Sequence, residues 1–250
     1  MMRRAPSILL LLAAHAGAWS GEVTLKLAID ANGAVDDLVG KSGRFTSPKS
    51  LDMVHYLRRA SDAVLVGAST VDRDDPALTV RRVAAPPTQP KRVVLDPNGR
   101  CRADSAVFAD GLASTVVFAR DPAARSLPAA VAVEPLAADG GAAAAIAGVV
   151  AALEGRHDVS KLMVEGGPFT ARAFLDAGLV DRAIIVRAPM AFSGDPVPSG
   201  IDAAALAAAG LAFHSRRDLD GDDVQTWCRG ATPPIWDCLL DGGEIPPKKT

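Results

Sequence analysis

Cysteine and histidine are both scarce in this chain of 250 residues. The three cysteines, Cys101, Cys228 and Cys238, lie far apart, so the sequence predicts neither a disulfide framework nor a zinc site. The four histidines are also scattered and lack the spacing of metal ligands. We therefore expect chemistry that needs no bound metal ion.

A strong excess of one charge and a long apolar run are missing as well. The formal net charge is −2 and no block of lysine and arginine occurs, which argues against nucleic acid as the main partner. The apolar run at 8–14 is shorter than the ~20 residues of a membrane-spanning helix, so no membrane association is expected. Hydrophobic residues make up 49% of the chain, enough for a full core in one large domain or two small ones.

The first twenty residues have the composition of a targeting leader. Arg3 and Arg4 precede the apolar run, and small residues at 16–18 precede Trp19. This order predicts a signal peptide cut near Ala18. An aromatic residue after such a site resembles the two-part plastid leaders of algae with secondary plastids. The alternative is a mis-assigned start on a cytoplasmic protein. We expect a leader over 1–20, one domain over 21–229 and a disordered proline-, glycine- and lysine-rich tail over 230–250.

Strand and helix patterns alternate through the predicted domain. Apolar runs predict strands at 23–29, 63–66, 92–95, 114–118, 131–133, 162–164 and 183–186. Helical spacing follows Ser47-Pro48, covers 142–153 and follows the double glycine at 166–167, and an alanine-rich stretch at 203–210 predicts a short helix. Residues 211–219 and 223–227 are expected to close the sheet as an antiparallel pair. The pattern predicts an α/β fold with a mostly parallel sheet flanked by helices.

The turn after the strand at 162–164 is the strongest candidate site. Glu165 stands at the strand end, and Gly166 and Gly167 allow a sharp turn and the close approach of a ligand. Pro168 suits the first turn of the helix that follows. The free N–H groups and the positive end of that helix form an anion site. From these residues alone, a tight turn without a ligand remains the alternative.

Three stretches together resemble one enzyme family. They are LKLAIDANG at 25–33, LRRASDAVLVGASTV at 57–71 continuing into DDPALTVR at 74–81, and the Glu165-Gly166-Gly167 turn. In this order and spacing they resemble the pyrimidine reductase of riboflavin biosynthesis, over roughly residues 22–228. The resemblance implies a dihydrofolate-reductase-like fold. It also implies that NADPH reduces the ribosylamino group of a pyrimidine phosphate to a ribitylamino group, with no metal and no activated nucleophile.

The resemblance also implies roles for individual residues, which we state as expectations. Lys26 and Glu165 are the expected catalytic pair, orienting the sugar and steadying the iminium and its proton. An arginine fork suits a substrate phosphate. The positions expected to bind substrate are Ser42, Arg58, Leu78, Arg81 and Glu165. Those expected to bind NADPH are Ala28, Arg44, Thr70, Asp74, Gly166, Gly167, Pro168, Phe169 and Thr170. Surface salt bridges for the arginines and a solubility role for Lys26 are the alternatives.

The chain departs from the family pattern at three places. Asp30 replaces a serine after the first strand and is expected to put a charge near the site. Arg44 stands where a tryptophan is usual and could meet a phosphate, and Pro97 replaces a hydroxyl residue. These changes bear on the identity of the substrate.

The zinc motif of the deaminase half, His-x-Glu followed by Pro-Cys-x-x-Cys, does not occur in the sequence. We therefore expect a stand-alone reductase, acting after a separate deaminase or before deamination. Another NADPH reductase of this fold and a non-catalytic nucleotide-binding homologue remain open alternatives. By resemblance, the chain is expected to form a homodimer.

Overall fold

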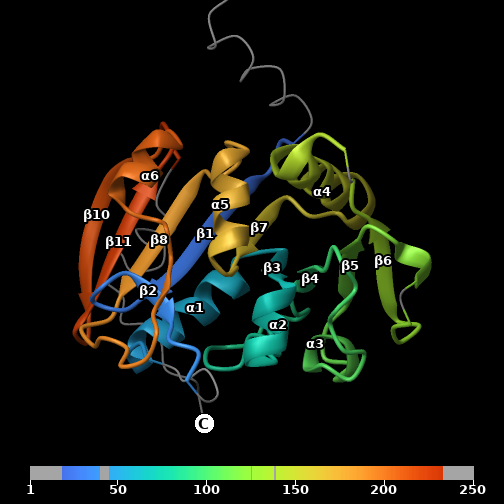
Figure 1. Cartoon of the computed structure of the whole chain (residues 1–250), viewed down its shortest axis with the longest axis horizontal. Coiled ribbons are helices and arrows are strands. Elements are labelled where there is room, and N and C mark those ends of the chain that lie inside the picture. The colour runs from blue at the N-terminus through green and yellow to red at the C-terminus, as the bar shows by residue number, and fades with distance from the viewer. Residues whose placement is uncertain (1–18, 40–44, 125, 138, 233–250) are drawn as a thin grey trace, which may run out of the picture.

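The computed structural model describes residues 19–39, 45–124, 126–137 and 139–232 (Figure 1). Most of the predicted leader and tail lies outside these ranges, as do Ser42 and Arg44. Trp19 packs against the hydrophobic core, and the Ser20 hydroxyl hydrogen-bonds to Glu154. No helix within the described residues has the length and apolar character needed to cross a membrane.

A nine-stranded sheet organises these residues, in the order β10-β11-β8-β1-β7-β3-β4-β5-β6. The seven strands from β8 to β6 run parallel, and β11 and β10 complete the sheet as an antiparallel pair. The strand bounds are β1 Glu22–Ile29, β3 Ala63–Gly67, β4 Lys91–Leu95, β5 Thr115–Ala119, β6 Val131–Pro135, β7 Lys161–Val164, β8 Arg182–Arg187, β10 Ala212–Leu219 and β11 Asp222–Cys228. A small second sheet pairs β2 (Ala34–Asp36) with β9 (Val197–Pro198).

Helices cover both faces of the large sheet. One core cluster packs the sheet against α4 (Gly141–His157), α5 (Pro168–Asp176) and α6 (Ala203–Ala208). The other packs it against α1 (Pro48–Arg59), α2 (Ala68–Asp74) and α3 (Ala106–Ala109), while the short 3-10 helix η3 covers Pro122–Ala124. Two covered faces explain why the central strands read as continuous apolar runs in the sequence.

The structure confirms the predicted α/β class, the mostly parallel sheet and the closing antiparallel pair. The strand and helix patterns correspond to observed elements, and Ser47 caps α1 by accepting a hydrogen bond from the Ser50 N–H at 3.1 Å. The sequence patterns missed α2 and α3, which have seven and four residues, and the strands of the small sheet. Elements this short carry too few residues to show a period.

The ends of three neighbouring strands position the candidate site. β7 lies between β1 and β3, with Val164 beside Leu25 on one side and Leu65 on the other. The N–H of Glu165 donates to the carbonyl of Leu65 at 2.8 Å, so β3 holds the residue in place immediately after β7 ends. Parallel α/β sheets bind ligands at this carboxyl edge.

Candidate active site

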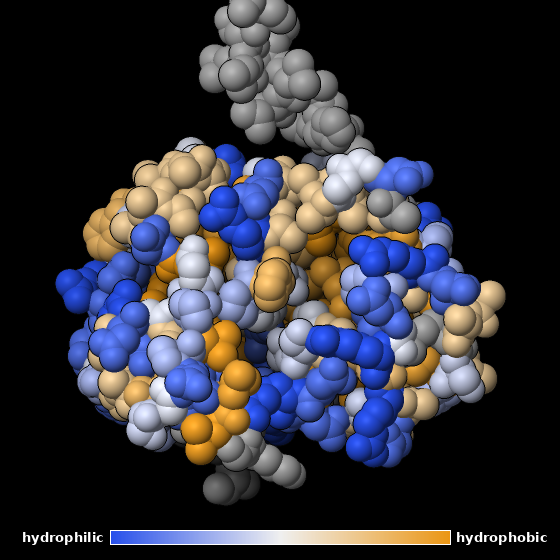
Figure 2. Space-filling model, in the orientation of Figure 1, coloured by the Kyte–Doolittle hydropathy of each residue, from blue (hydrophilic) through white to orange (hydrophobic). Residues whose placement is uncertain are grey.

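A cavity of about 610 Å³ opens at the carboxyl ends of β1, β3 and β7. In Figure 2, the molecular surface that faces the viewer is hollowed near its middle. Most of the predicted site residues within the described ranges line this cavity, although they come from widely separated parts of the sequence. They are Lys26, Ala28, Arg58, Thr70, Asp74, Leu78, Arg81, Glu165, Gly166, Gly167 and Pro168.

A bidentate ion pair forms one wall of the cavity. The Arg58 guanidinium donates through Nε to Glu165 Oε1 at 2.6 Å and through Nη2 to Glu165 Oε2 at 2.8 Å. The two side chains are only 9% and 12% exposed, so water screens the pair poorly. Arg58 comes from the last turn of α1 and Glu165 from the end of β7. The pair therefore ties the end of α1 to the end of a central strand of the sheet.

Lys26 lies near this ion pair on β1. Burial lowers the pKa of the Lys26 amine, and the Arg58 charge adds to that effect, while Glu165 and Asp222 act in the opposite direction. Burial by itself would raise the pKa of Glu165, but the charge and hydrogen bonds of Arg58, together with Lys26, outweigh it and lower that pKa. A carboxylate held ionised beside an amine with a lowered pKa is a suitable arrangement for moving a proton.

The glycine turn that follows Glu165 is sterically crowded on one side and open on the other. A Cβ on Gly166 would lie 2.5 Å from Thr170 Cβ, and one on Gly67 would lie 2.6 Å from Thr170 Oγ1. Among the described residues, a Cβ on Gly167 would meet only Thr70 Oγ1, at 3.7 Å. Glycines therefore bring the start of α5 close to β3 and leave space in front of its first N–H groups, which lack partners inside the helix.

A second cavity of about 560 Å³ lies beside the first and shares Ser69 with it. Phe169 and Thr170 line this second cavity, and the Phe169 side chain is 92% exposed. Arg100 and Arg120 add positive charge to its wall. The start of α5 thus lies between two adjoining cavities, with room for an elongated ligand across it.

The Asp30 carboxylate, expected near the site, is instead stabilised by backbone hydrogen bonds. Its carboxylate accepts hydrogen bonds from the N–H groups of Asn32, Ala34 and Phe192 at 2.9, 2.8 and 3.0 Å. Burial would raise the pKa of Asp30, but these hydrogen bonds outweigh it and lower the pKa. Asp30 is 1% exposed and is not among the residues that line either cavity, so we assign it to the turn after β1.

Sequence reasoning missed two charged or polar features of the site. His55 lies one helical turn before Arg58 on α1, and its Nδ1 accepts from the Arg81 N–H at 3.0 Å. Its three-residue spacing from Arg58 could have indicated it, because such positions share a helix face. The ion pair between Arg73 Nε and Asp36 Oδ2, at 2.7 Å, also lines the first cavity and has no comparable sequence pattern.

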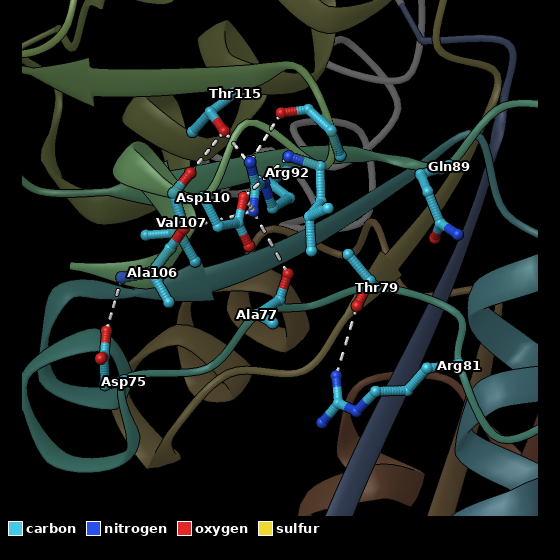
Figure 3. Close-up of polar contacts among 12 residues, drawn as sticks. Asp75, Ala77, Thr79, Arg81, Gln89, Arg92, Ala106, Val107, Asp110 and Thr115 are labelled. Carbon is cyan, nitrogen blue, oxygen red and sulfur yellow. Dashed lines mark hydrogen bonds and ion pairs between the residues drawn. The ribbon is translucent and has the colours of Figure 1, made fainter.

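A buried arginine outside the cavity supports the segment that carries Leu78 and Arg81. Arg92 is 1% exposed and donates to Asp110 Oδ1 at 2.7 Å, to Thr115 Oγ1 at 3.0 Å and to the carbonyl of Ala77 at 3.4 Å (Figure 3). Asp75 accepts from the Ala106 N–H at 2.7 Å at the start of the same segment. Strands β4 and β5 thereby anchor one border of the cavity.

The described residues contain no group of three or more histidine, cysteine, aspartate or glutamate side chains able to hold a metal ion. The site can bind one anion at the start of α5 and a second anion near the arginines that line the first cavity. It can also control a proton between Lys26 and Glu165.

The chain is similar to known proteins over most of its length. Residues 22–214 match the family described as RibD C-terminal domain. The riboflavin biosynthesis protein RibD of Aquifex aeolicus is 38% identical over 174 residues, covering 67% of this chain and 46% of that protein. The chain thus spans about half the length of this relative.

A relative of similar size comes from Methanothermobacter thermautotrophicus. This 2,5-diamino-6-ribosylamino-4(3H)-pyrimidinone 5′-phosphate reductase is 33% identical over 189 residues, covering 72% of this chain and 83% of that protein. Among solved structures, the Thermotoga maritima diaminohydroxyphosphoribosylaminopyrimidine deaminase/5-amino-6-(5-phosphoribosylamino)uracil reductase superposes with a TM-score of 0.69 and 27% identity, covering 84% of this chain and 57% of that one. On this sequence and structural similarity, the chain belongs to the RibD C-terminal domain family.

Proposed function

We propose that this chain is an NADPH-dependent reductase that converts the ribosylamino side chain of a pyrimidine phosphate to the ribitylamino form. The observation that carries the proposal is the position of Lys26 and the Arg58–Glu165 pair. They line one cavity, directly beside the glycine turn that opens α5. Hydride transfer to this substrate requires that the substrate be held against the cofactor and that the charge on the C=N group be stabilised. The side chains of this cavity are suited to both tasks.

The residues of the two adjoining cavities suit the shape and charge of NADPH. The open side of Gly167 and the first N–H groups of α5 would hold the cofactor phosphates. Ala28 and Thr70 line the first cavity, where the small side chain of Ala28 leaves room for the nicotinamide ring. The second cavity, with Arg100 and Arg120, would take the adenosine end. When bound, the cofactor supplies the hydride.

The protein's own groups then bind the substrate and manage one proton. Arg81 would bind the substrate phosphate at the cavity border, since a guanidinium fork matches phosphate oxygens. Glu165, held ionised by Arg58, would orient a sugar hydroxyl and stabilise the cationic C=N group. In the net reaction, hydride adds to the C1′ carbon of the ring-opened sugar, and the C=N nitrogen takes up one proton to become the amine. Lys26, with its lowered pKa, would supply that proton.

The pyrimidine has two candidate forms. The archaeal relative is named for the diaminopyrimidinone, and this chain covers 83% of its length. The bifunctional RibD relatives are matched over about half their length or less, and the Thermotoga protein is named for the deaminated uracil substrate. Because the RibD relative of Aquifex aeolicus is more identical to this chain than the archaeal relative, at 38% against 33%, we propose the deaminated uracil form as substrate, with the diaminopyrimidinone as the alternative.

The test is an NADPH-oxidation assay with the purified chain and each of the two pyrimidine phosphates in turn. We expect turnover with at least one of them, and the ratio of kcat/KM values identifies the substrate. Tight NADPH binding without turnover of either compound would favour a nucleotide-binding homologue instead.

Substitution of Arg81 tests the assignment of the phosphate site. We expect Arg81→Ala to raise the KM of the phosphorylated substrate by about 10–100-fold with a small change in kcat, because a charged hydrogen bond to phosphate is lost. Arg59→Ala, an exposed arginine on the same helix as Arg58, serves as the control and should leave KM unchanged. An unchanged KM in Arg81→Ala would favour a surface salt bridge.

We also propose that the chain assembles as a homodimer and works with a separate deaminase. This proposal rests on the family resemblance, and light scattering of the purified chain tests the oligomeric state.

A further inference from the structure

The segment that carries Arg81 has no regular secondary structure, although much of it is buried. Residues 75–81 lie outside every helix and strand, yet Leu78, Thr79 and Val80 are all at most 5% exposed. Buried backbone N–H and C=O groups must find hydrogen-bond partners. Here side chains from other elements provide them.

The partners of residues 79–81 alternate from side to side. The Gln89 side chain hydrogen-bonds to both backbone polar groups of Val80. Its Oε1 accepts from the Val80 N–H at 2.7 Å, and its Nε2 donates to the Val80 carbonyl at 3.1 Å. Side chains of helix α1 hydrogen-bond to the backbone groups that flank Val80, the Thr79 carbonyl and the Arg81 N–H. Arg58 Nη1 donates to the carbonyl of Thr79 at 3.1 Å, and His55 Nδ1 accepts from the Arg81 N–H at 3.0 Å.

This alternation is the hydrogen-bond pattern of an extended chain, in which successive residues present their polar groups to opposite edges. His55 and Arg58 are three residues apart on α1, so they share a helix face and can bind groups two residues apart on the segment. The helix therefore takes the place of one neighbouring strand, and Gln89 takes the place of the other.

His55 suits this task because it stays neutral. It is 4% exposed, and burial together with the charges of Arg58 and Arg81 lowers its pKa to about 3. A ring nitrogen that accepts from a backbone N–H carries no proton, so the ring proton is on Nε2. The neutral ring thus offers an acceptor at Nδ1 throughout the physiological pH range.

We propose that His55 is a positioning residue for phosphate recognition: its Nδ1 holds the main chain of Arg81 so that the Arg81 guanidinium is presented to the substrate phosphate. This inference deepens the proposed function and rests on it for the identity of the substrate. His55 itself is assigned no contact with substrate or cofactor.

Three substitutions separate positioning from simple loss of packing. His55→Asn keeps an acceptor close to the position of Nδ1. His55→Gln moves the polar group toward the position of Nε2, and His55→Leu removes the acceptor. We expect the Leu and Gln variants to raise the substrate KM about tenfold, with kcat and NADPH affinity within about threefold of wild type. The Asn variant should be within about threefold of wild type in all three quantities.

Binding of ribose 5-phosphate, measured by calorimetry, provides a readout that does not depend on turnover. We expect its affinity to fall about tenfold in His55→Leu and His55→Gln and to recover in His55→Asn. His214→Leu, at an exposed histidine on β10, is the control and should bind like wild type. If His55→Leu does not fold, the Asn and Gln pair still decides the question.

Two outcomes would overturn the inference. One is equal sugar-phosphate affinity in the Asn and Gln variants, and the other is a parallel loss of kcat, KM and NADPH binding in both. Failure of the proposed function looks different, because the wild type would then reduce neither pyrimidine. In that event the ribose 5-phosphate series still tests whether His55 positions Arg81.

Discussion

The two ends of the candidate site are built from different kinds of groups. At the end near β1 and α1, charged side chains make the site, and Arg58 and Glu165 are nearly buried. At the end near α5, glycines and the backbone of a helix start make it. The end near β1 and α1 depends on buried charged side chains that need their ion-pair partners. The end near α5 depends on the absence of side chains at the glycines, which leaves room for a ligand. Substitutions at the two ends should therefore fail in different ways.

The largest effect is expected from removing the charge of Glu165. Glu165→Gln keeps the shape but takes away the carboxylate that faces Arg58 and Lys26, so kcat should fall by about 10²–10⁴-fold. NADPH affinity should change by less than about twofold. Steady-state kinetics and cofactor titration measure the two quantities. Glu134→Gln breaks an ion pair with the exposed Arg156, away from both cavities, and serves as the control. An equal loss of cofactor binding would place Glu165 at the other end of the site.

The next effect concerns stability at the charged end. Arg58→Met leaves Glu165 buried without its partner and should lower the free energy of unfolding by about 3–5 kcal/mol at neutral pH. Arg156→Met should cost at most about 1 kcal/mol, because Arg156 is 54% exposed. Urea denaturation measures both. Similar losses of unfolding free energy in the two variants would show that burial of the Arg58–Glu165 pair does not increase its contribution to stability.

A smaller effect is expected at the glycine end. Gly166→Ala places a methyl group 2.5 Å from Thr170 Cβ, so α5 must shift, at a cost of about 1–3 kcal/mol and with weaker NADPH binding. Within the described residues, Gly167→Ala places its methyl group no closer than 3.7 Å to another side chain and should leave the melting temperature unchanged. Thermal melts of the two variants test this contrast. If both variants lose stability equally, the crowding argument is wrong.

The smallest change per step is a pH dependence at the charged end. His55 has a pKa of about 3 in the folded state, below the ordinary value of about 6.5 in the unfolded chain. As the pH falls from 6.5 toward 3, the unfolded state binds the proton first, so stability falls by up to about 1.4 kcal/mol per pH unit. Urea denaturation at pH 7, 6 and 5 should show this slope in wild type and a shallower one in His55→Asn. Identical slopes would mean that His55 titrates normally in the fold.

Much of the fold follows from the sequence, because the longer strands and helices leave recognisable patterns of apolar residues. Strands such as Ala63–Gly67 are buried on both faces and read as continuous apolar stretches. The helix that begins at Pro168 is indicated by the double glycine before it and the helical spacing after it. Short elements such as α3, with four residues, have no period to detect.

The candidate site was predictable to the extent that it lies in contiguous motifs. Lys26, Arg58, Arg81 and Glu165 could be named by resemblance, and the structure brings all four to one cavity. Their roles stay predictions until the variants above are measured. Ser42 and Arg44 lie outside the described residues.

The sequence by itself determined the order of the longer strands and helices along the chain, the position of the glycine turn and the types of charged residue available to the site. Only the tertiary structure decided which of these residues meet. The pairing of Arg58 with Glu165 spans 107 positions, and the contact of His55 with Arg81 spans 26. Such contacts depend on how a parallel sheet brings distant strand ends to one edge, and no local pattern encodes that arrangement.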